Sequence, residues 1–174
     1  MSIFSSLSEK YDQIWQYFIR PPRIKYSEED LGPSSYSLYE TDTQVVRTSF
    51  DIPHKKYVLK TSLYTPGENA TKSLLIYLHS HSGSQLEGKG LVDVLLPHGT
   101  CLCTFDFGGA GRSTGKYISL GYKEHKELKT VLNYLISTYK FEKISIYGKS
   151  MGAVAALLLI GKNPEMFPQI ETLI

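Results

Sequence analysis

One serine in this sequence has the surroundings of a catalytic nucleophile. Ser150 lies at the centre of Gly-Lys-Ser-Met-Gly, residues 148–152. The pattern G-x-S-x-G is typical of a tight turn from a strand into a helix, where Gly148 and Gly152 allow close backbone approach and the serine hydroxyl stands above a sheet. The backbone N–H of Met151 would then face the oxygen that becomes negative during acyl transfer. We therefore expect Ser150 to be the nucleophile of an acyl-transfer reaction.

A second segment that could do chemistry is His-Ser-His-Ser-Gly at residues 79–83. We interpret it as a loop whose backbone supplies the other half of an oxyanion hole, through the N–H of His81. In this interpretation His79 anchors the loop and Gly83 lets it turn. The spacing H-x-H also suits zinc, so a zinc hydrolase built on His79 and His81 is a less favoured alternative, because no third ligand follows in the loop.

The third segment is glycine-rich and begins at Asp106, with the pattern D-x-x-G-x-G-x-S. We expect Asp106 to hold this loop together by accepting hydrogen bonds from backbone N–H groups, rather than to act in catalysis. No segment has the spacing of a phosphate loop or of a dinucleotide-binding motif, so we expect no cofactor.

Each of these loops follows a short, almost continuously apolar run, which is typical of a strand that is buried on both faces. Helical patterns follow the loops, and such alternation indicates a parallel sheet that binds ligands beyond the carboxyl ends of its strands. The expected buried strands are 73–78, 100–105, 143–147 and the start of a further strand at 170–174, and the expected helices lie near 91–95, 128–139 and 150–160.

Upstream of the apolar runs, residues 44–52 and 56–64 alternate in character and are expected to form an antiparallel strand pair, separated at Pro53-His54. The expected fold class is therefore α/β: a mostly parallel sheet with an antiparallel N-terminal strand pair and helices on both faces.

The first residues predict an amphipathic helix over 6–19, with apolar side chains at helical spacing that include Trp15 and Phe18. We expect Trp15 and Phe18 to be buried, against this domain or a partner, because an exposed aromatic stripe is costly. Residues 26–43 are polar and predict an irregular connector. The expected division is an N-terminal helix and connector at 1–43 and, at 44–174, an incomplete α/β domain that carries the nucleophile half of the site.

The composition is that of a soluble globular protein, with 41% hydrophobic residues, 21% charged residues and a net charge of +2. Scattered charge argues against nucleic-acid binding, and no apolar run is long enough for a transmembrane segment. Cys101 and Cys103 are expected to be buried thiols on one face of a strand. We expect a cytoplasmic protein.

The three loops together resemble those of the α/β-hydrolase superfamily, and most closely those of the plant and protist serine aminopeptidase S33-like hydrolases. The Arg-Pro-Pro-Arg turn at 20–23, the Ser-Leu-Gly segment at 119–121 and the Gly-x-Ser-Met-Gly-Ala turn at 148–153 carry this likeness. The resemblance implies a serine hydrolase acting on an ester, thioester or amide, with an acyl-containing small molecule, lipid or peptide as substrate. This sequence departs from the family at His79-Ser80, where the family usually has His-Gly.

The resemblance also implies that the catalytic acid and histidine follow the nucleophile, but the sequence after Ser150 contains no Asp and no His. We therefore expect residues 1–174 to be the N-terminal part of a hydrolase, truncated after the start of its sixth strand and inactive in isolation. A protein partner would cover the sheet edge after Ile174. The alternative is a non-catalytic structural or interaction subunit built on a hydrolase fold.

Overall fold

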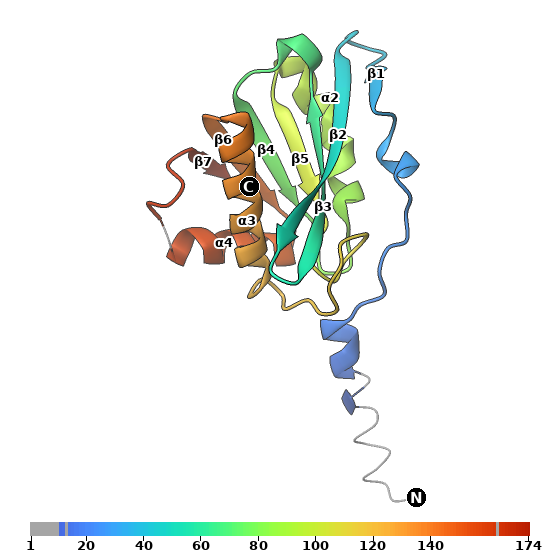
Figure 1. Ribbon diagram of the computed structural model, residues 1–174, viewed down its shortest axis with the longest axis vertical. Helices are drawn as coiled ribbons and strands as arrows, with labels where there is room; N and C mark the ends of the chain where they lie inside the picture. Colours follow the sequence, from blue (N-terminus) through green and yellow to red (C-terminus); the bar gives the residue numbers. More distant parts are fainter. Residues whose placement is uncertain (1–10, 13, 163) are drawn as a thin grey trace, which may run out of the picture.

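The computed structural model describes residues 11–174 except 13 and 163. Within these residues the strands form one seven-stranded sheet in the order β1-β2-β3-β5-β4-β6-β7 (Figure 1). Residues 11–12 and 14–19 are helical. The other elements are η1 (Glu29–Leu31), β1 (Ser35–Ser37), β2 (Gln44–His54), β3 (Tyr57–Thr65), η2 (Gly67–Asn69), β4 (Ser73–Leu78), η3 (Gln85–Leu91), α2 (Val92–Leu95), η4 (Leu96–His98), β5 (Cys101–Phe105), α3 (Glu124–Tyr139), β6 (Lys143–Gly148), α4 (Met151–Lys162) and β7 (Ile170–Leu173).

The strand directions match the expected fold class. Strands β1, β2 and β3 pair antiparallel, and β3 joins β5 in the same way. Strands β5, β4, β6 and β7 then run parallel to one another. The expected strand at 170–174 is present as β7, and it is the seventh strand along the chain because β1 adds one that was not expected.

Two local expectations upstream of the parallel strands were wrong. Residues 26–43 are not wholly irregular, because they contain η1 and β1. Pro53 and His54 do not separate the strand pair but belong to β2, and the turn falls at Lys55, whose φ is +53°. A proline fits there because β1 pairs only with the first residues of β2, so β2 is an edge strand at Pro53.

Helices cover both faces of the sheet, as the buried strands predicted. Alternate side chains of β4 point to opposite faces, with Ile76 in one apolar cluster and Leu75 in the other. The Ile76 cluster contains the buried sides of α3 and α4, whereas the Leu75 cluster contains residues of α2 and η4. Figure 1 shows α3 lying across one face of the sheet.

The two cysteines lie on β5, fully buried in the same apolar cluster as Ile76. Burial raises the pKa of the Cys101 thiol to about 11 and that of the Cys103 thiol further. Both are free, neutral thiols at physiological pH, as expected.

Of the two surroundings expected for Trp15 and Phe18, burial against this domain was wrong, and burial against a partner stays a prediction. Trp15 and Phe18 are 51% and 47% exposed, and the helix extends away from the sheet (Figure 1). Only its last turn is attached: the Ile118 N–H donates to the Ile19 carbonyl over 3.0 Å, and Nε2 of His81 lies 2.7 Å from the Phe18 carbonyl. The backbone, and not the aromatic stripe, therefore fixes this helix. The start of the predicted helix, residues 6–10, lies outside the described residues.

None of the helices in the described part of the chain is both long and apolar enough to cross a bilayer.

Candidate active site

The three predicted loops leave the sheet at one edge. Leu78, the last residue of β4, pairs with Gly148, the last residue of β6, and Tyr77 pairs with Thr104 near the end of β5. Parallel strands that end in register bring the segments after them together. The turn at Ser150, the loop at 79–84 and the loop that begins at Asp106 are therefore neighbours.

The turn at Ser150 has the strained geometry of a nucleophile turn. Ser150 has a φ of +51°, which is unusual for a residue with a side chain, and the residue is exposed. A Cβ atom on Gly148 would lie 2.6 Å from the backbone of Ala153, and one on Gly152 would lie 2.3 Å from the Leu78 carbonyl oxygen. Both glycines are therefore required by close backbone approach.

Helix α4 begins directly after this serine, at Met151. The first N–H groups of a helix have no partner within it and carry partial positive charge. The side chain of Met151 is only 2% exposed and anchors the residue in the core. Its backbone N–H, like the others of the first turn, points out of the N-terminal end of the helix. The Lys149 N–H donates to the Leu78 carbonyl over 3.0 Å and fixes the turn to β4.

His79 is buried completely, and both of its ring nitrogens have protein partners. The Phe107 N–H donates to Nε2 over 3.0 Å, so Nδ1 carries the proton and donates to the Ser80 carbonyl over 2.7 Å. Burial lowers the pKa of this imidazole, which is therefore neutral. His79 ties the 79–84 loop to the Asp106 loop, and its nitrogens are not available to a metal ion. Among residues 11–12, 14–162 and 164–174, no cluster of three metal-ligating side chains occurs.

Glu87 organises the loop that contains His81. Its carboxylate accepts hydrogen bonds from the Ser80 N–H at 3.2 Å, from the Ser80 hydroxyl at 2.8 Å and from the Tyr77 hydroxyl at 3.2 Å. The Lys149 ammonium lies 3.7 Å from the same carboxylate. Glu87 therefore connects the loop to the residue that precedes Ser150.

The same carboxylate explains the glycine in this loop. A Cβ on Gly83 would lie 2.1 Å from Oε1 of Glu87. Burial alone would raise the pKa of Glu87, but the hydrogen bonds from Ser80 outweigh it and lower that pKa. Sequence reasoning missed Glu87, although Ser84 and Glu87 have the spacing of a capping box that would have drawn attention to it. Its side chain bonds to Ser80 instead of the helix start.

Asp106 holds its loop through the bonds expected of it. Its carboxylate accepts from the Gln85 N–H at 2.8 Å, from the Arg112 N–H at 2.7 Å and from the Tyr26 hydroxyl. A Cβ on Gly111 would lie 2.3 Å from this carboxylate, at a φ of +42°. Burial, with the adjacent Asp106 carboxylate, raises the pKa of Tyr26 well above its usual range, so the phenol stays a donor.

Two further buried carboxylates at the start of α3 were not foreseen. Glu124 accepts from the Ser119 N–H at 2.8 Å and from the Gly121 N–H at 2.8 Å. Glu127 accepts from the Gly108 N–H at 2.8 Å, and burial raises its pKa. These carboxylates fix the two ends of segment 108–121 by accepting hydrogen bonds from its backbone N–H groups.

No histidine ring is joined to the nucleophile candidate. In the part of the chain that the structure describes, no hydrogen bond is recorded for the Ser150 hydroxyl. His125 is 5% exposed and its Nδ1 lies 3.2 Å from the Gly121 carbonyl, while Nδ1 of His54 lies 2.7 Å from the Thr130 hydroxyl. Glu171 lies 3.8 Å from the Lys143 ammonium, and Glu165 is exposed.

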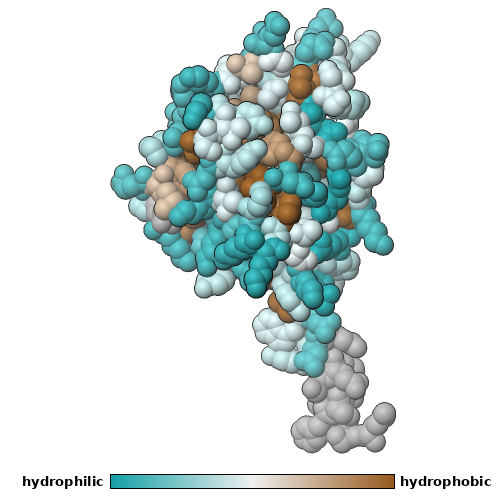
Figure 2. Space-filling view, in the orientation of Figure 1, coloured by the Kyte–Doolittle hydropathy of each residue, from teal (hydrophilic) through white to brown (hydrophobic). Residues whose placement is uncertain are grey.

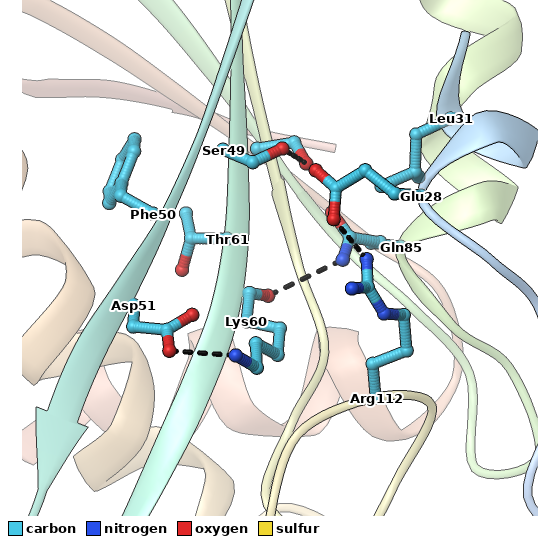
Figure 3. A pocket seen from close by; sticks show the side chains of 10 residues that line it. Glu28, Leu31, Ser49, Phe50, Asp51, Lys60, Thr61, Gln85 and Arg112 are labelled. Atoms are coloured by element: carbon cyan, nitrogen blue, oxygen red, sulfur yellow. Dashed lines mark hydrogen bonds and ion pairs between the residues drawn. The ribbon is translucent and has the colours of Figure 1, made fainter.

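A cavity of about 310 Å³ lies elsewhere, where the connector meets β2 and β3 (Figure 3). Two ion pairs line it: Arg112 with Glu28 at 2.6 Å and Lys60 with Asp51 at 2.7 Å. Ser150 is not among the residues that line this cavity. Because its charges pair with one another, the cavity has no uncompensated group that selects a ligand.

Known proteins that are similar to this chain include α/β hydrolases. The profile of a family described as "Alpha/beta hydrolase of unknown function (DUF915)" matches residues 119–174, from the Ser-Leu-Gly segment through the serine turn. Among curated proteins, YqkD of Bacillus subtilis is 29% identical over 80% of this chain and 47% of its own length. R595 of Acanthamoeba polyphaga mimivirus is 29% identical over 53% of this chain and 33% of its own. The chain thus spans half the length of these relatives or less.

Solved structures agree with the sequence matches. The esterase Pf2001 of Pyrococcus furiosus superposes with a TM-score of 0.65 at 25% identity, covering 85% of this chain and 54% of the esterase. An α/β serine hydrolase homologue from Coxiella burnetii gives a TM-score of 0.54 at 23% identity, covering 74% of this chain and 61% of that one, and shows likeness of fold. None of these matches singles out the S33-like subgroup. The strand order, the turn at Ser150 and these similarities assign the chain to the α/β-hydrolase superfamily.

Proposed function

We propose that the protein is a serine hydrolase that transfers the acyl group of an ester, thioester or amide to water, with Ser150 as its nucleophile. The observation that carries this proposal is the conformation of Ser150. It is an exposed serine at a φ of +51°, between two glycines that have no room for a side chain. Strain of this kind persists only where the surrounding structure enforces it, and it is concentrated at active sites.

The proposed oxyanion hole consists of the backbone N–H groups of Met151 and His81. Met151 contributes as the first residue of α4, where helix N–H groups are unpaired. His81 contributes from a loop that Glu87 and His79 hold in place. Two fixed N–H donors stabilise the developing negative charge of a tetrahedral intermediate without reorganising during the reaction.

A serine hydroxyl needs a base, and the proposal assigns that base to residues outside 1–174. The five histidines of this sequence all precede Ser150, whereas the base of this fold follows the nucleophile. His79 cannot serve, since both ring nitrogens bond to the loops around it. The acid and the histidine of the triad are therefore sought in the protein beyond residue 174.

The test is a hydrolysis assay of the natural full-length protein with short acyl esters, thioesters and amides of p-nitrophenol, thiophenol and p-nitroaniline. Ser150→Ala is expected to lose activity by at least about 10³-fold, as removal of a nucleophile does. Ser137→Ala, at an exposed position of α3, is the matched control and is expected to keep full activity. Equal activity in the two variants would overturn the assignment of Ser150.

The alternative is a non-catalytic interaction subunit that uses the hydrolase fold as a scaffold. The observation in its favour is that none of the described histidines hydrogen-bonds to Ser150. It predicts a full-length protein that hydrolyses none of these esters, thioesters or amides, with or without Ser150.

A further inference from the structure

Several exposed aromatic and apolar side chains gather at the edge of the sheet where Ser150 lies. Trp15 and Phe18 of the N-terminal helix are 51% and 47% exposed, and Tyr117, Leu120 and Tyr122 are 44%, 47% and 61% exposed. Single exposed apolar residues are ordinary, but a contiguous group marks an interaction site.

These side chains form one surface, because direct contacts join the segments that carry them. The Ile118 N–H donates to the Ile19 carbonyl over 3.0 Å, which places the end of the helix beside Tyr117. The Phe18 and His81 rings are 6.5 Å apart, so the helix also meets the loop proposed for the oxyanion hole. We call the surface formed by Trp15, Phe18, Arg20 and residues 116–126, with Lys162, the rim patch.

The rim patch borders the serine turn. A Cβ on Gly121 would lie 2.5 Å from the Val154 side chain, so the 119–121 segment packs against the first turn of α4. The Val154 N–H in turn donates to the Ser150 carbonyl over 3.1 Å. A surface bound by the rim patch would therefore lie beside Ser150.

Cations lie over the exposed rings of this patch. The Arg20 guanidinium is 5.5 Å and the Lys123 ammonium 5.9 Å from the centre of the Tyr117 ring. The Lys126 and Lys162 ammonium groups are 5.0 Å and 5.6 Å from the centre of the Tyr122 ring.

These cations have no carboxylate partners on the surface. In the described part of the chain, none of the recorded ion pairs includes Arg20, Lys123, Lys126 or Lys162. The nearest acidic side chain along the chain, Glu124, is buried and bonded to Ser119 and Gly121. The rim patch therefore presents positive charge that this part of the molecule leaves uncompensated.

A membrane surface with anionic lipids binds proteins that present aromatic rings beside lysine and arginine. Trp and Tyr prefer the interface between headgroups and acyl chains, and lysines are attracted to the negative headgroups. A partly charged, partly aromatic surface suits this interface better than the dry core of a protein–protein contact, from which lysine is depleted. Figure 2 shows hydrophilic and pale residues intermixed, with little brown, where the helix joins the body.

We propose that the rim patch docks the protein on an anionic lipid surface, with Ser150 facing the membrane. The inference concerns binding alone and does not rest on the proposed hydrolase activity.

The test is co-sedimentation of the full-length protein with vesicles of phosphatidylcholine, with and without 30% phosphatidylserine (an assay composition of roughly the anionic fraction that gives a cytoplasmic surface potential). Binding to the anionic vesicles is expected at 0.1 M salt and is expected to fall sharply at 0.5 M, because salt screens the attraction. Equal binding to both vesicle types, or to neither, would overturn the proposal. A soluble polyanion such as heparin is the competitor. If heparin bound the protein as tightly as the anionic vesicles do and displaced it from them, the preference for lipid would be overturned.

Matched variants locate the surface. The triple variant Lys123→Gln, Lys126→Gln, Lys162→Gln is expected to bind anionic vesicles about a hundredfold more weakly, at about fivefold per lysine. The control Lys72→Gln, Lys140→Gln, Lys143→Gln removes the same charge at the opposite end of the strands and is expected to bind like the wild type. A third variant, Lys123→Arg, Lys126→Arg, Lys162→Arg, keeps the charge and is expected to bind like the wild type. Equal losses in the first two variants would overturn the proposed location.

Discussion

Glu87 shows what a single residue contributes to this site. The Glu87 carboxylate accepts a hydrogen bond from the Ser80 hydroxyl and lies 3.7 Å from the ammonium of Lys149, so it joins the 79–84 loop to the serine turn. At Ser80 the side-chain hydroxyl gives the loop a second hydrogen bond to Glu87, beside the one that the Ser80 N–H donates.

We expect Glu87→Gln to slow the covalent labelling of Ser150 by a fluorophosphonate in the full-length protein, because the amide nitrogen cannot accept the hydrogen bonds that the carboxylate accepts. Unfolding free energy at pH 7 is expected to fall by roughly 1–2 kcal/mol, less than for a buried charged hydrogen bond because this group is partly exposed. Urea unfolding and labelling rates measure the two effects. Unchanged values of both would contradict the role given to Glu87.

The pH dependence distinguishes this role from simple packing. The pKa of Glu87 is lowered in the folded state, so its carboxylate stabilises the fold above the unfolded pKa of about 4.3. That stabilisation is lost as the pH falls through the folded pKa. The stability difference between wild type and Glu87→Gln is therefore expected to shrink between pH 6 and pH 3. A difference that stays constant over this range would indicate lost packing instead.

Glycines in α4 provide a second test at this scale. Gly152→Ala places a Cβ 2.3 Å from the Leu78 carbonyl oxygen and is expected to cost about 3 kcal/mol of unfolding free energy. Gly161→Ala, in the same helix with nothing within 4 Å, is expected to stabilise the protein by about 0.5–1 kcal/mol. Thermal or urea unfolding compares the two. Similar effects of both substitutions would contradict the close approach of α4 to β4.

At the scale of elements, the sequence predicted best where burial governs structure. The runs 73–78, 100–105 and 143–147 are almost entirely apolar, and they form the central parallel strands within a residue of the expected bounds. Prediction failed where a few local contacts decide. Pro53 remains in β2 because that part of the strand has a free edge. The aromatic stripe at Trp15 stays exposed because its helix is attached only at its last turn, through the carbonyls of Phe18 and Ile19.

The burial of leucine side chains on α3 and α4 predicts how much each leucine contributes to the free energy of unfolding. Leu132 on α3 is fully buried in the core cluster, so Leu132→Ala is expected to cost about 2–5 kcal/mol of unfolding free energy. Leu157 on α4 is 63% exposed, and Leu157→Ala in the 174-residue chain is expected to cost less than about 1 kcal/mol. Urea unfolding of the two variants, compared with wild type, measures the difference. A larger cost at Leu157 would mean that another surface covers this side of α4.

At the scale of the whole molecule, the loops at one sheet edge combine three kinds of structure. A strained serine turn, a loop held by neutral His79, and a glycine-rich loop held by Asp106 meet at the carboxyl ends of parallel strands. Their positions could be predicted because each follows a buried strand. The positions of the carboxylates of Glu87, Glu124 and Glu127 could not, since only the folded chain shows that a charged side chain is wholly or partly removed from water and hydrogen-bonded.

The central claim is that Ser150 is a nucleophile, and covalent labelling of the full-length protein with a fluorophosphonate tests it most directly. After digestion, mass spectrometry is expected to find the phosphonyl group on the peptide that contains Ser150, and Ser150→Ala is expected to remove it. The Ser137→Ala control should label like the wild type. If the full-length, folded protein carried no adduct on Ser150, or carried it on another serine, the account of this site would be contradicted.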